Sequence, residues 1–319
     1  MLNFYTQKVE SYLENYSLPI SPVNLYEPLG YFLGLGGKRL RPVLTLIAAE
    51  LGGKSADEAI HAAVSIELFH NFSLIHDDIM DNAPIRRGLP TVHEKWNSNI
   101  AILSGDVLLV KAYELISKQN KEHIPDLYQL FNKTAIEVCE GQQMDMDFEI
   151  REDVTIEEYI AMIRLKTSVL LGCALEFGFL ISNQSVENRK NIYDFGVNLG
   201  IAFQIQDDIL DLYGDPDKVG KQVGGDVRAN KKTLLYLAAE KICKNLNNNK
   251  LNSLKETKDL DKKVQETSTF YKEIGVLEET QKYLNYYYDS AMKSLELVDV
   301  NSSKDNLHQM VNYLFNRQS

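Results

Sequence analysis

The sequence lacks most features of secreted, membrane-spanning and disulfide-bonded proteins. Its 319 residues contain three cysteines and no CxxC pair, which argues against a disulfide framework and against a thiolate metal site. No uninterrupted apolar run approaches the roughly 18 residues of a membrane span, and the first residues lack the order of a signal peptide. These absences predict a cytoplasmic protein without a membrane span.

Positive charges are outnumbered by negative charges. The chain has 34 Lys and Arg against 45 Asp and Glu, a formal net charge of −11. Nucleic-acid binding selects for basic faces, so this balance argues against a nucleic-acid partner. A local basic cluster remains compatible with a small anion.

Alternating runs of β-branched residues are missing, and apolar residues recur instead at steps of three and four. Glycine and proline fall between these periodic segments, and no stretch has the composition of an interdomain linker. The pattern predicts an all-α chain, folded as a single-domain multi-helix bundle over 1–319. Its expected helices include 56–76, 100–118, 126–144, 156–181, 187–212, 232–245 and 277–297.

Two stretches concentrate aspartates in matching contexts. Residues 73–81 read SLIHDDIMD and residues 203–211 read FQIQDDILD. On a helix the first and last aspartates of Asp-Asp-x-x-Asp lie one turn apart, where like charges destabilise the helix unless a cation neutralises them. Carboxylates alone suit Mg²⁺, which fills its other positions with water and substrate phosphate. The predicted metal ligands are Asp77, Asp78, Asp81, Asp207, Asp208 and Asp211.

Apolar neighbours of both clusters predict a pocket for an amphiphile with a diphosphate head, and basic residues are spaced along the chain to hold it. GGKRLRP over 36–42 combines glycines with three cations, and Arg86-Arg87-Gly88 follows the first aspartate cluster. Arginine forks bind phosphate oxygens in pairs. A basic loop is also compatible with a plain solvated surface, and Lys166 with a helix lysine whose charge reaches solvent.

Taken together, these motifs resemble the trans-polyprenyl diphosphate synthase family, of the farnesyl and geranylgeranyl diphosphate synthase type. The resemblance rests on GGKRLRP, DDIMD followed by RRG, Gly141-Gln142, Lys166-Thr167, FQIQDDILD and the GK…NK loop, and it covers about 36–232. It implies an all-α bundle around a deep central cavity, normally a homodimer, with three Mg²⁺ ions. The implied reaction joins an allylic diphosphate (dimethylallyl, geranyl or farnesyl) head to tail to isopentenyl diphosphate.

The resemblance also assigns roles to residues. It implies that Asp77 and Asp81 bind two metals, that Asp207 and Asp211 bind the third, and that Asp78 and Asp208 support them. The allylic diphosphate is expected at Arg86, Lys166, Lys221 and Lys231, isopentenyl diphosphate at Lys38, Arg41, His70 and Arg87, and the reacting centre beside Thr167 and Gln204.

Product length is expected to depend on what blocks the cavity below the first cluster. One helical turn is about 5.4 Å, roughly one isoprene unit, so Phe72, Ser73 and Phe69 are candidates for the floor. An aromatic residue at the position of Phe72 resembles the C20 pattern of the family, with farnesyl diphosphate (C15) as the alternative product. A purely structural role for Phe72 and His70 stays open.

Two other functions remain open. A terpene cyclase shares the fold and the first aspartate motif, and a non-catalytic partner subunit belongs to a heteromeric synthase. The first typically has an Asn/Ser/Glu triad at its second metal site and the second tends to lose aspartates, whereas this chain keeps all six. The tyrosines at 283 and 286–288 indicate packing or a dimer surface, and Arg317 is a candidate for closing over diphosphate.

Overall fold

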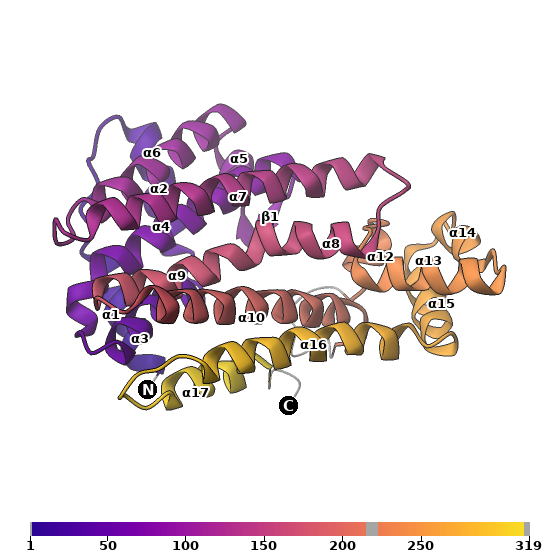
Figure 1. Cartoon of the computed structure of the whole chain (residues 1–319). Helices are drawn as coiled ribbons and strands as arrows, with labels where there is room; N and C mark the ends of the chain where they lie inside the picture. The colour runs from indigo at the N-terminus through magenta and orange to yellow at the C-terminus, as the bar shows by residue number, and fades with distance from the viewer. Residues whose placement is uncertain (1, 215–222, 316–319) are drawn as a thin grey trace. The chain divides into compact units, whose positions relative to one another are not determined.

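The computed structural model describes residues 2–214 and 223–315, and it confirms the predicted all-α fold (Figure 1). Within these residues, no helix combines the length and apolar character needed to cross a bilayer. The elements are α1 (Leu2–Glu14), α2 (Val23–Gly34), α3 (Leu40–Leu51), α4 (Ala56–Met80), β1 (Ile85–Arg86), β2 (Leu89–Pro90), α5 (Val92–Lys95), α6 (Ser98–Ile116), α7 (Ile124–Ile150), α8 (Ile156–Ile163), η1 (Arg164–Ser168), α9 (Val169–Ile181), α10 (Val186–Tyr213), α12 (Gly225–Arg228), α13 (Leu234–Leu246), α14 (Lys250–Lys255), α15 (Leu260–Glu273), α16 (Val276–Glu296) and α17 (Asp305–Phe315).

The chain forms two compact units. Unit 1 comprises Met1–Lys133, Cys173–Tyr193 and Asp299–Leu307, and unit 2 comprises Thr134–Gly172, Asp194–Val298 and His308–Ser319. Each unit contains one of the two aspartate clusters.

Helix α4 is the central element of unit 1 and packs against α3 and α6. It begins with a capping box, in which Ser55 and Glu58 satisfy each other's backbone N–H groups. Ala59, Ala62 and Ala63 are fully buried, since small side chains allow neighbouring helices to approach closely. The buried packing of α4 therefore fixes the position of the aspartates at its C-terminal end.

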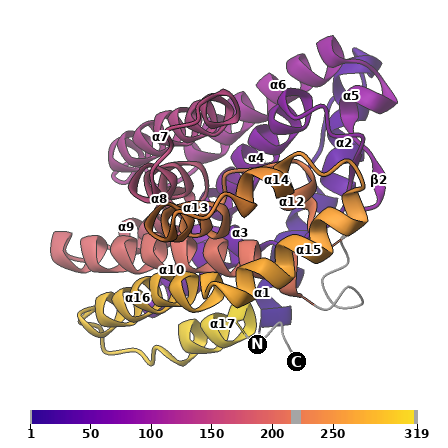
Figure 2. The ribbon, with the colours of Figure 1, turned by 90° about the vertical axis from the view of Figure 1, so that its right-hand side faces the viewer.

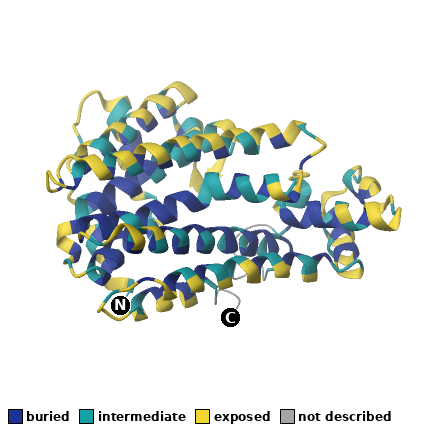
Figure 3. Cartoon of the chain, in the orientation of Figure 1, coloured by how far each residue is buried: buried dark blue, intermediate teal, exposed yellow. Residues whose placement is uncertain are grey.

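In unit 2, α16 runs alongside α10 in both ribbon views (Figures 1 and 2). Its buried residues recur every four to seven positions, at Val276, Thr280, Leu284, Ala291 and Leu295. This spacing produces one buried and one exposed side, as Figure 3 shows. The short helices α13, α14 and α15 pack together, and α12 lies against α15 (Figure 2).

The segment 156–181, predicted as one continuous helix, is interrupted by the π-helical turn η1. A π-helical turn contains more residues than an α-helical turn, and a search for apolar residues with a 3.6-residue period does not detect this difference. Two glycines accommodate η1: a Cβ on Gly141 of α7 would lie 2.7 Å from the carbonyl carbon of Leu165, and one on Gly200 of α10 would lie 2.8 Å from Cα of Ser168. The π turn carries Lys166 and Thr167.

A small hairpin follows α4 and was not expected from the sequence. Strands β1 and β2 are antiparallel, with Arg86 paired to Leu89. The two residues between them, Arg87 and Gly88, have φ of 54° and 79°. Two successive positive φ angles are typical of a tight hairpin turn. This turn fixes where Arg86 and Arg87 leave the backbone.

Candidate active site

The first aspartate cluster lies at the C-terminal end of α4. Asp77 is half-buried and Asp81, the capping residue of the helix, is exposed, whereas Asp78 has 2% of its surface exposed. The negative end of a helix dipole disfavours carboxylates. Arg86 offsets part of this charge, because its Nε donates to both carboxylate oxygens of Asp78 at 2.8 Å and its Nη2 lies 3.5 Å from Asp77. Burial still raises the pKa of Asp78, while Arg86 lowers it.

The three cations of GGKRLRP have different environments. Arg39 is 3% exposed and donates to Glu10 and Glu67, both at 2.7 Å, and to the Leu33 carbonyl at 2.8 Å. Its charge is therefore used inside the protein. Lys38 is exposed and Arg41 is half-buried, so these two remain the candidates for an anion.

Arg41 and His70 form a pair. Arg41 Nη1 lies 3.1 Å from His70 Nε2, an arrangement in which a neutral imidazole accepts the hydrogen bond. Burial, then the Arg41 charge, hold the pKa of His70 well below 6.5, and burial lowers the pKa of Arg41 to about 10. Around neutral pH the pair therefore presents one positive charge, supplied by arginine.

This pair predicts a pH dependence of stability. The unfolded chain takes up a proton on His70 near pH 6.5 and the folded chain does not, so the free energy of unfolding falls as pH drops below that value. In His70→Gln the amide oxygen still accepts from Arg41 but does not titrate. Urea unfolding of the metal-free proteins between pH 7 and 5 measures the effect. We expect the free energy of unfolding to fall less steeply with decreasing pH in His70→Gln than in the wild type, by up to about 1.4 kcal/mol per pH unit. Equal slopes in both proteins would contradict the neutral assignment.

Arg87 binds the glycines that precede the basic loop. Its Nη1 donates to the Gly36 carbonyl oxygen. Gly37 has φ of 147°, and a Cβ there would lie 3.1 Å from the guanidinium carbon of Arg87. The glycine pair thus brings Arg87, which is exposed, close to the basic loop of unit 1.

The candidate chain-length residues differ in exposure. Phe69 is 1% exposed, and its ring lies 5.2 Å from that of Phe131 and 5.7 Å from that of Phe72. Phe72 is half-buried and its ring lies 4.6 Å from that of His76. The Ser73 hydroxyl donates to the His70 carbonyl at 2.9 Å. Phe69 thus belongs to the core, and Phe72 keeps a partly exposed face.

The second cluster lies in the last two turns of α10. Asp208 is 5% exposed, and it accepts hydrogen bonds from the Tyr159 hydroxyl and, at 3.2 Å, from Gln204 Nε2. Burial and the nearby charge of Asp226 raise the pKa of Asp208 to about 8. Asp207 and Asp211 are half-buried. In each cluster, therefore, the middle aspartate is buried and the outer two are more accessible.

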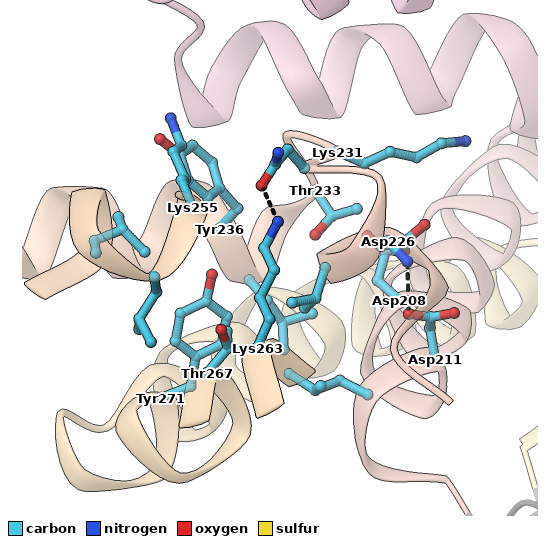
Figure 4. A pocket seen from close by; sticks show the side chains of 16 residues that line it. Asp208, Asp211, Asp226, Lys231, Thr233, Tyr236, Lys255, Lys263, Thr267 and Tyr271 are labelled. Atoms are coloured by element: carbon cyan, nitrogen blue, oxygen red, sulfur yellow. Dashed lines mark hydrogen bonds between the residues drawn. The ribbon is translucent and has the colours of Figure 1, made fainter. Parts of the chain in front are cut away.

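Asp211 also fixes the chain beyond α10. Its Oδ2 accepts from the Asp226 backbone N–H at 3.0 Å, and its carbonyl oxygen accepts from Gly224 N–H at 2.6 Å. These bonds hold the start of α12 against the end of α10 (Figure 4).

A cavity of about 660 Å³ opens beside this cluster in unit 2. Lys166 projects from η1 and its Nζ lies 2.6 Å from Asp145 Oδ2 on α7. Lys232 donates to the Phe148 carbonyl at 2.6 Å. The cavity thus joins four predicted substrate residues to one predicted metal ligand: Lys166, Thr167, Gln204, Lys231 and Asp208.

Some residues of this half were missed from the sequence. Nothing in the sequence singled out Asp145, whose carboxylate is the partner of Lys166. Tyr159, the hydrogen-bond donor to Asp208, is one of 17 tyrosines and stands in no motif. The predicted residues Lys221 and Arg317 lie outside the described residues.

The donor set suits a hard cation. Among residues 2–214 and 223–315, no three His, Cys, Asp or Glu side chains converge on one point. Mg²⁺ typically takes one or two carboxylates and completes its shell with water and phosphate. The accessible pairs Asp77 with Asp81 and Asp207 with Asp211 match that requirement.

Comparison with known proteins agrees with this arrangement. The family model described as polyprenyl synthetase matches residues 22–274. The chain is 36% identical to a geranylgeranyl pyrophosphate synthase of Geoglobus acetivorans, over 98% of this chain and 95% of that protein. It is 41% identical to a geranylfarnesyl diphosphate synthase of Natronomonas pharaonis, over 70% and 71%. A crystal structure of a geranylgeranyl pyrophosphate synthase superposes with a TM-score of 0.93 at 42% identity, covering 100% of this chain and 98% of the other. The chain therefore belongs to the polyprenyl synthetase family and is a prenyltransferase.

Proposed function

We propose that the chain condenses an allylic diphosphate with isopentenyl diphosphate, head to tail and with Mg²⁺, to geranylgeranyl diphosphate. The observation that carries this proposal is the repeated aspartate cluster, with two accessible carboxylates and one buried carboxylate in each copy. The 660 Å³ cavity beside the second copy, lined by Lys166 and Lys231, supplies room and cations for a diphosphate. The names of the relatives above support the C20 product.

Three Mg²⁺ ions are expected per site, two held by Asp77 and Asp81 and one by Asp207 and Asp211. Asp78 and Asp208 are expected to support these metal ligands, because both are buried and accept hydrogen bonds from protein side chains. Bound metal would supply electrostatic stabilisation to a leaving diphosphate.

The protein's own residues have three tasks. Lys166 and Lys231 bind and orient the allylic diphosphate, and Arg86 compensates charge at the first cluster. Lys38, Arg41, His70 and Arg87 bind isopentenyl diphosphate. The third task is to exclude water, which would otherwise capture the allylic cation formed when the C–O bond ionises. The departing diphosphate is the expected acceptor of the proton lost after the new C–C bond forms.

Incubation of the purified protein with Mg²⁺, isopentenyl diphosphate and each allylic primer tests the function. Elongation to C20 is the expected result. Cyclised hydrocarbon would favour a terpene cyclase, and no product would favour a non-catalytic partner subunit. The cyclase is disfavoured by three aspartates at the second cluster, and the partner subunit by the retention of all six.

Product length provides a separate prediction. Phe72 stands about one turn before Asp77 on α4 and keeps a partly exposed face. Phe72→Ala is expected to lengthen the product by at least one isoprene unit, because one turn spans roughly that length. Product chromatography measures it, with Phe4→Ala, which alters an exposed aromatic on α1, as the control. Unchanged product length would show that Phe72 is not the floor, and a C15 product in the wild type would favour farnesyl diphosphate.

We further propose that residues 1–319 work as one polyprenyl synthase domain in a cytoplasmic homodimer. The family match supports the single domain, because residues 22–274 draw on both units. Helix α6 supports the dimer, since Ile102, Leu103 and Val110 are 41%, 58% and 65% exposed and exposed apolar faces typically mark protein interfaces. Light scattering measures the oligomeric state.

A further inference from the structure

Helix α15 packs against residues 224–231, the described stretch that contains α12 and ends at Lys231. Gly224, at the start of this segment, faces Val264, and a Cβ on the glycine would lie 2.6 Å from Val264 Cγ2. At the other end, Lys263 Nζ donates to Asn230 Oδ1 at 2.6 Å (Figure 4). We refer to residues 224–231 as the α12 segment.

Lys263 is an unusual residue for such a contact because it is 3% exposed. Burying an ammonium group is costly unless it is paired or hydrogen-bonded. Among the described residues, no carboxylate lies within ion-pair distance of Lys263, and its ammonium group donates to the amide oxygen of Asn230. Desolvation and the charge of Lys255 lower its pKa. A solvated lysine would avoid these costs, so the contact with Asn230 is a specific feature of this fold.

Asn230 combines this side-chain contact with a left-handed backbone conformation. Its φ is 53°, in the left-handed region that asparagine adopts more readily than most residues. Lys231 follows directly, and its N–H donates to the Asp226 carbonyl at 2.9 Å. The α12 segment is therefore attached to Asp211 at its start and to Lys263 at its end.

We propose that Lys263 is a positioning residue, which holds Asn230 and thereby directs Lys231 toward the 660 Å³ cavity where the allylic diphosphate binds. This inference rests on the proposed function, because it assigns a diphosphate to that cavity. Lys263 contacts the α12 segment and is not among the residues that line this cavity, whereas Asn230 and Lys231 both line it.

Lys263→Met tests the proposal, with Lys262→Met as the matched control. Lys262 is the preceding residue on α15, and its side chain is 61% exposed. The loss of a hydrogen bond to a charged group typically weakens an interaction about tenfold. We expect the KM for the allylic diphosphate to rise about tenfold in Lys263→Met and the KM for isopentenyl diphosphate to stay within about twofold. Lys262→Met should match the wild type in both.

Asn230→Gly is the second variant, since glycine accepts the positive φ but removes the amide acceptor. It should reproduce the KM change, and combining it with Lys263→Met should add little, because both remove one contact. The proposal would be overturned if the KM values for both substrates rose together or if neither of them rose.

Amide hydrogen exchange and binding of inorganic diphosphate with Mg²⁺ decide the inference without turnover. Faster exchange across 224–231 and weaker diphosphate binding are expected in Lys263→Met and Asn230→Gly. Unchanged exchange and binding would refute the positioning role. If the wild type fails to elongate any primer, the proposed function fails, while these two measurements still report on the contact.

Discussion

Replacing Asp77 or Asp207 with asparagine is expected to lower kcat/KM for elongation by about 100- to 1000-fold, because each change removes charge from a proposed metal site that would stabilise a leaving diphosphate. The metal-free protein is expected to become more stable at the same time. Asp77 lies in the last turn of α4, where a carboxylate is unfavourable by about 0.3–1 kcal/mol. Asp207 lies one helical turn before Asp211 on α10, and like charges at this spacing destabilise a helix. Steady-state kinetics and thermal unfolding measure the two effects.

Two further variants give this prediction its controls. Asp57→Asn changes an exposed aspartate in the first turn of α4 and should leave turnover unchanged. Asp78→Asn should lower stability instead of raising it, since it leaves Arg86 without the carboxylate that it binds at 2.8 Å. Near-normal turnover in Asp77→Asn or Asp207→Asn would refute the metal assignment.

Gly141→Ala is expected to destabilise the protein by about 1–3 kcal/mol, the usual cost of overpacking. The added methyl group would collide with the backbone of Leu165 and Lys166. Relief of that collision requires η1 to move away from α7, which also separates Lys166 from Asp145. Activity should therefore fall at least about tenfold at temperatures where the variant is folded.

Gly30→Ala is a matched control, because Gly30 is also inside a helix and a Cβ there meets no atom within 4 Å. Alanine favours a helix over glycine by about 0.5–1 kcal/mol, so Gly30→Ala should be neutral or slightly stabilising. Denaturant unfolding of the two variants separates propensity from packing. A Gly141→Ala protein as stable and active as the wild type would show that η1 does not need this close approach.

The helices were the most predictable part of the molecule. Segments such as 56–76 and 187–212 are recognisable because apolar residues repeat with the helical period, and the structure extends them to Ala56–Met80 and Val186–Tyr213. The π turn η1 and the hairpin at Arg87 were not predicted. Both depend on backbone geometry enforced by neighbouring elements, and a single sequence does not display those contacts.

The chemistry of the site was partly predictable for a related reason. Asp-Asp-x-x-Asp is recognisable because it opposes helix stability, so two copies require a functional explanation. Contacts between residues that are distant in the sequence were not predictable. They include Asp145 with Lys166, Tyr159 with Asp208 and Lys263 with Asn230. Arg39 shows the reverse case, since it stands in a basic motif but binds Glu10 and Glu67 inside unit 1.

The proposed function requires that the two aspartate clusters hold the metal ions that bind the allylic diphosphate. A crystal structure with Mn²⁺ and a non-hydrolysable allylic diphosphate analogue tests it most directly, because anomalous scattering locates each ion. We expect three ions, two beside Asp77 and Asp81 and one beside Asp207 and Asp211, with Lys166 and Lys231 in contact with the diphosphate. Ions bound elsewhere, or an analogue bound without contact to either cluster, would contradict it.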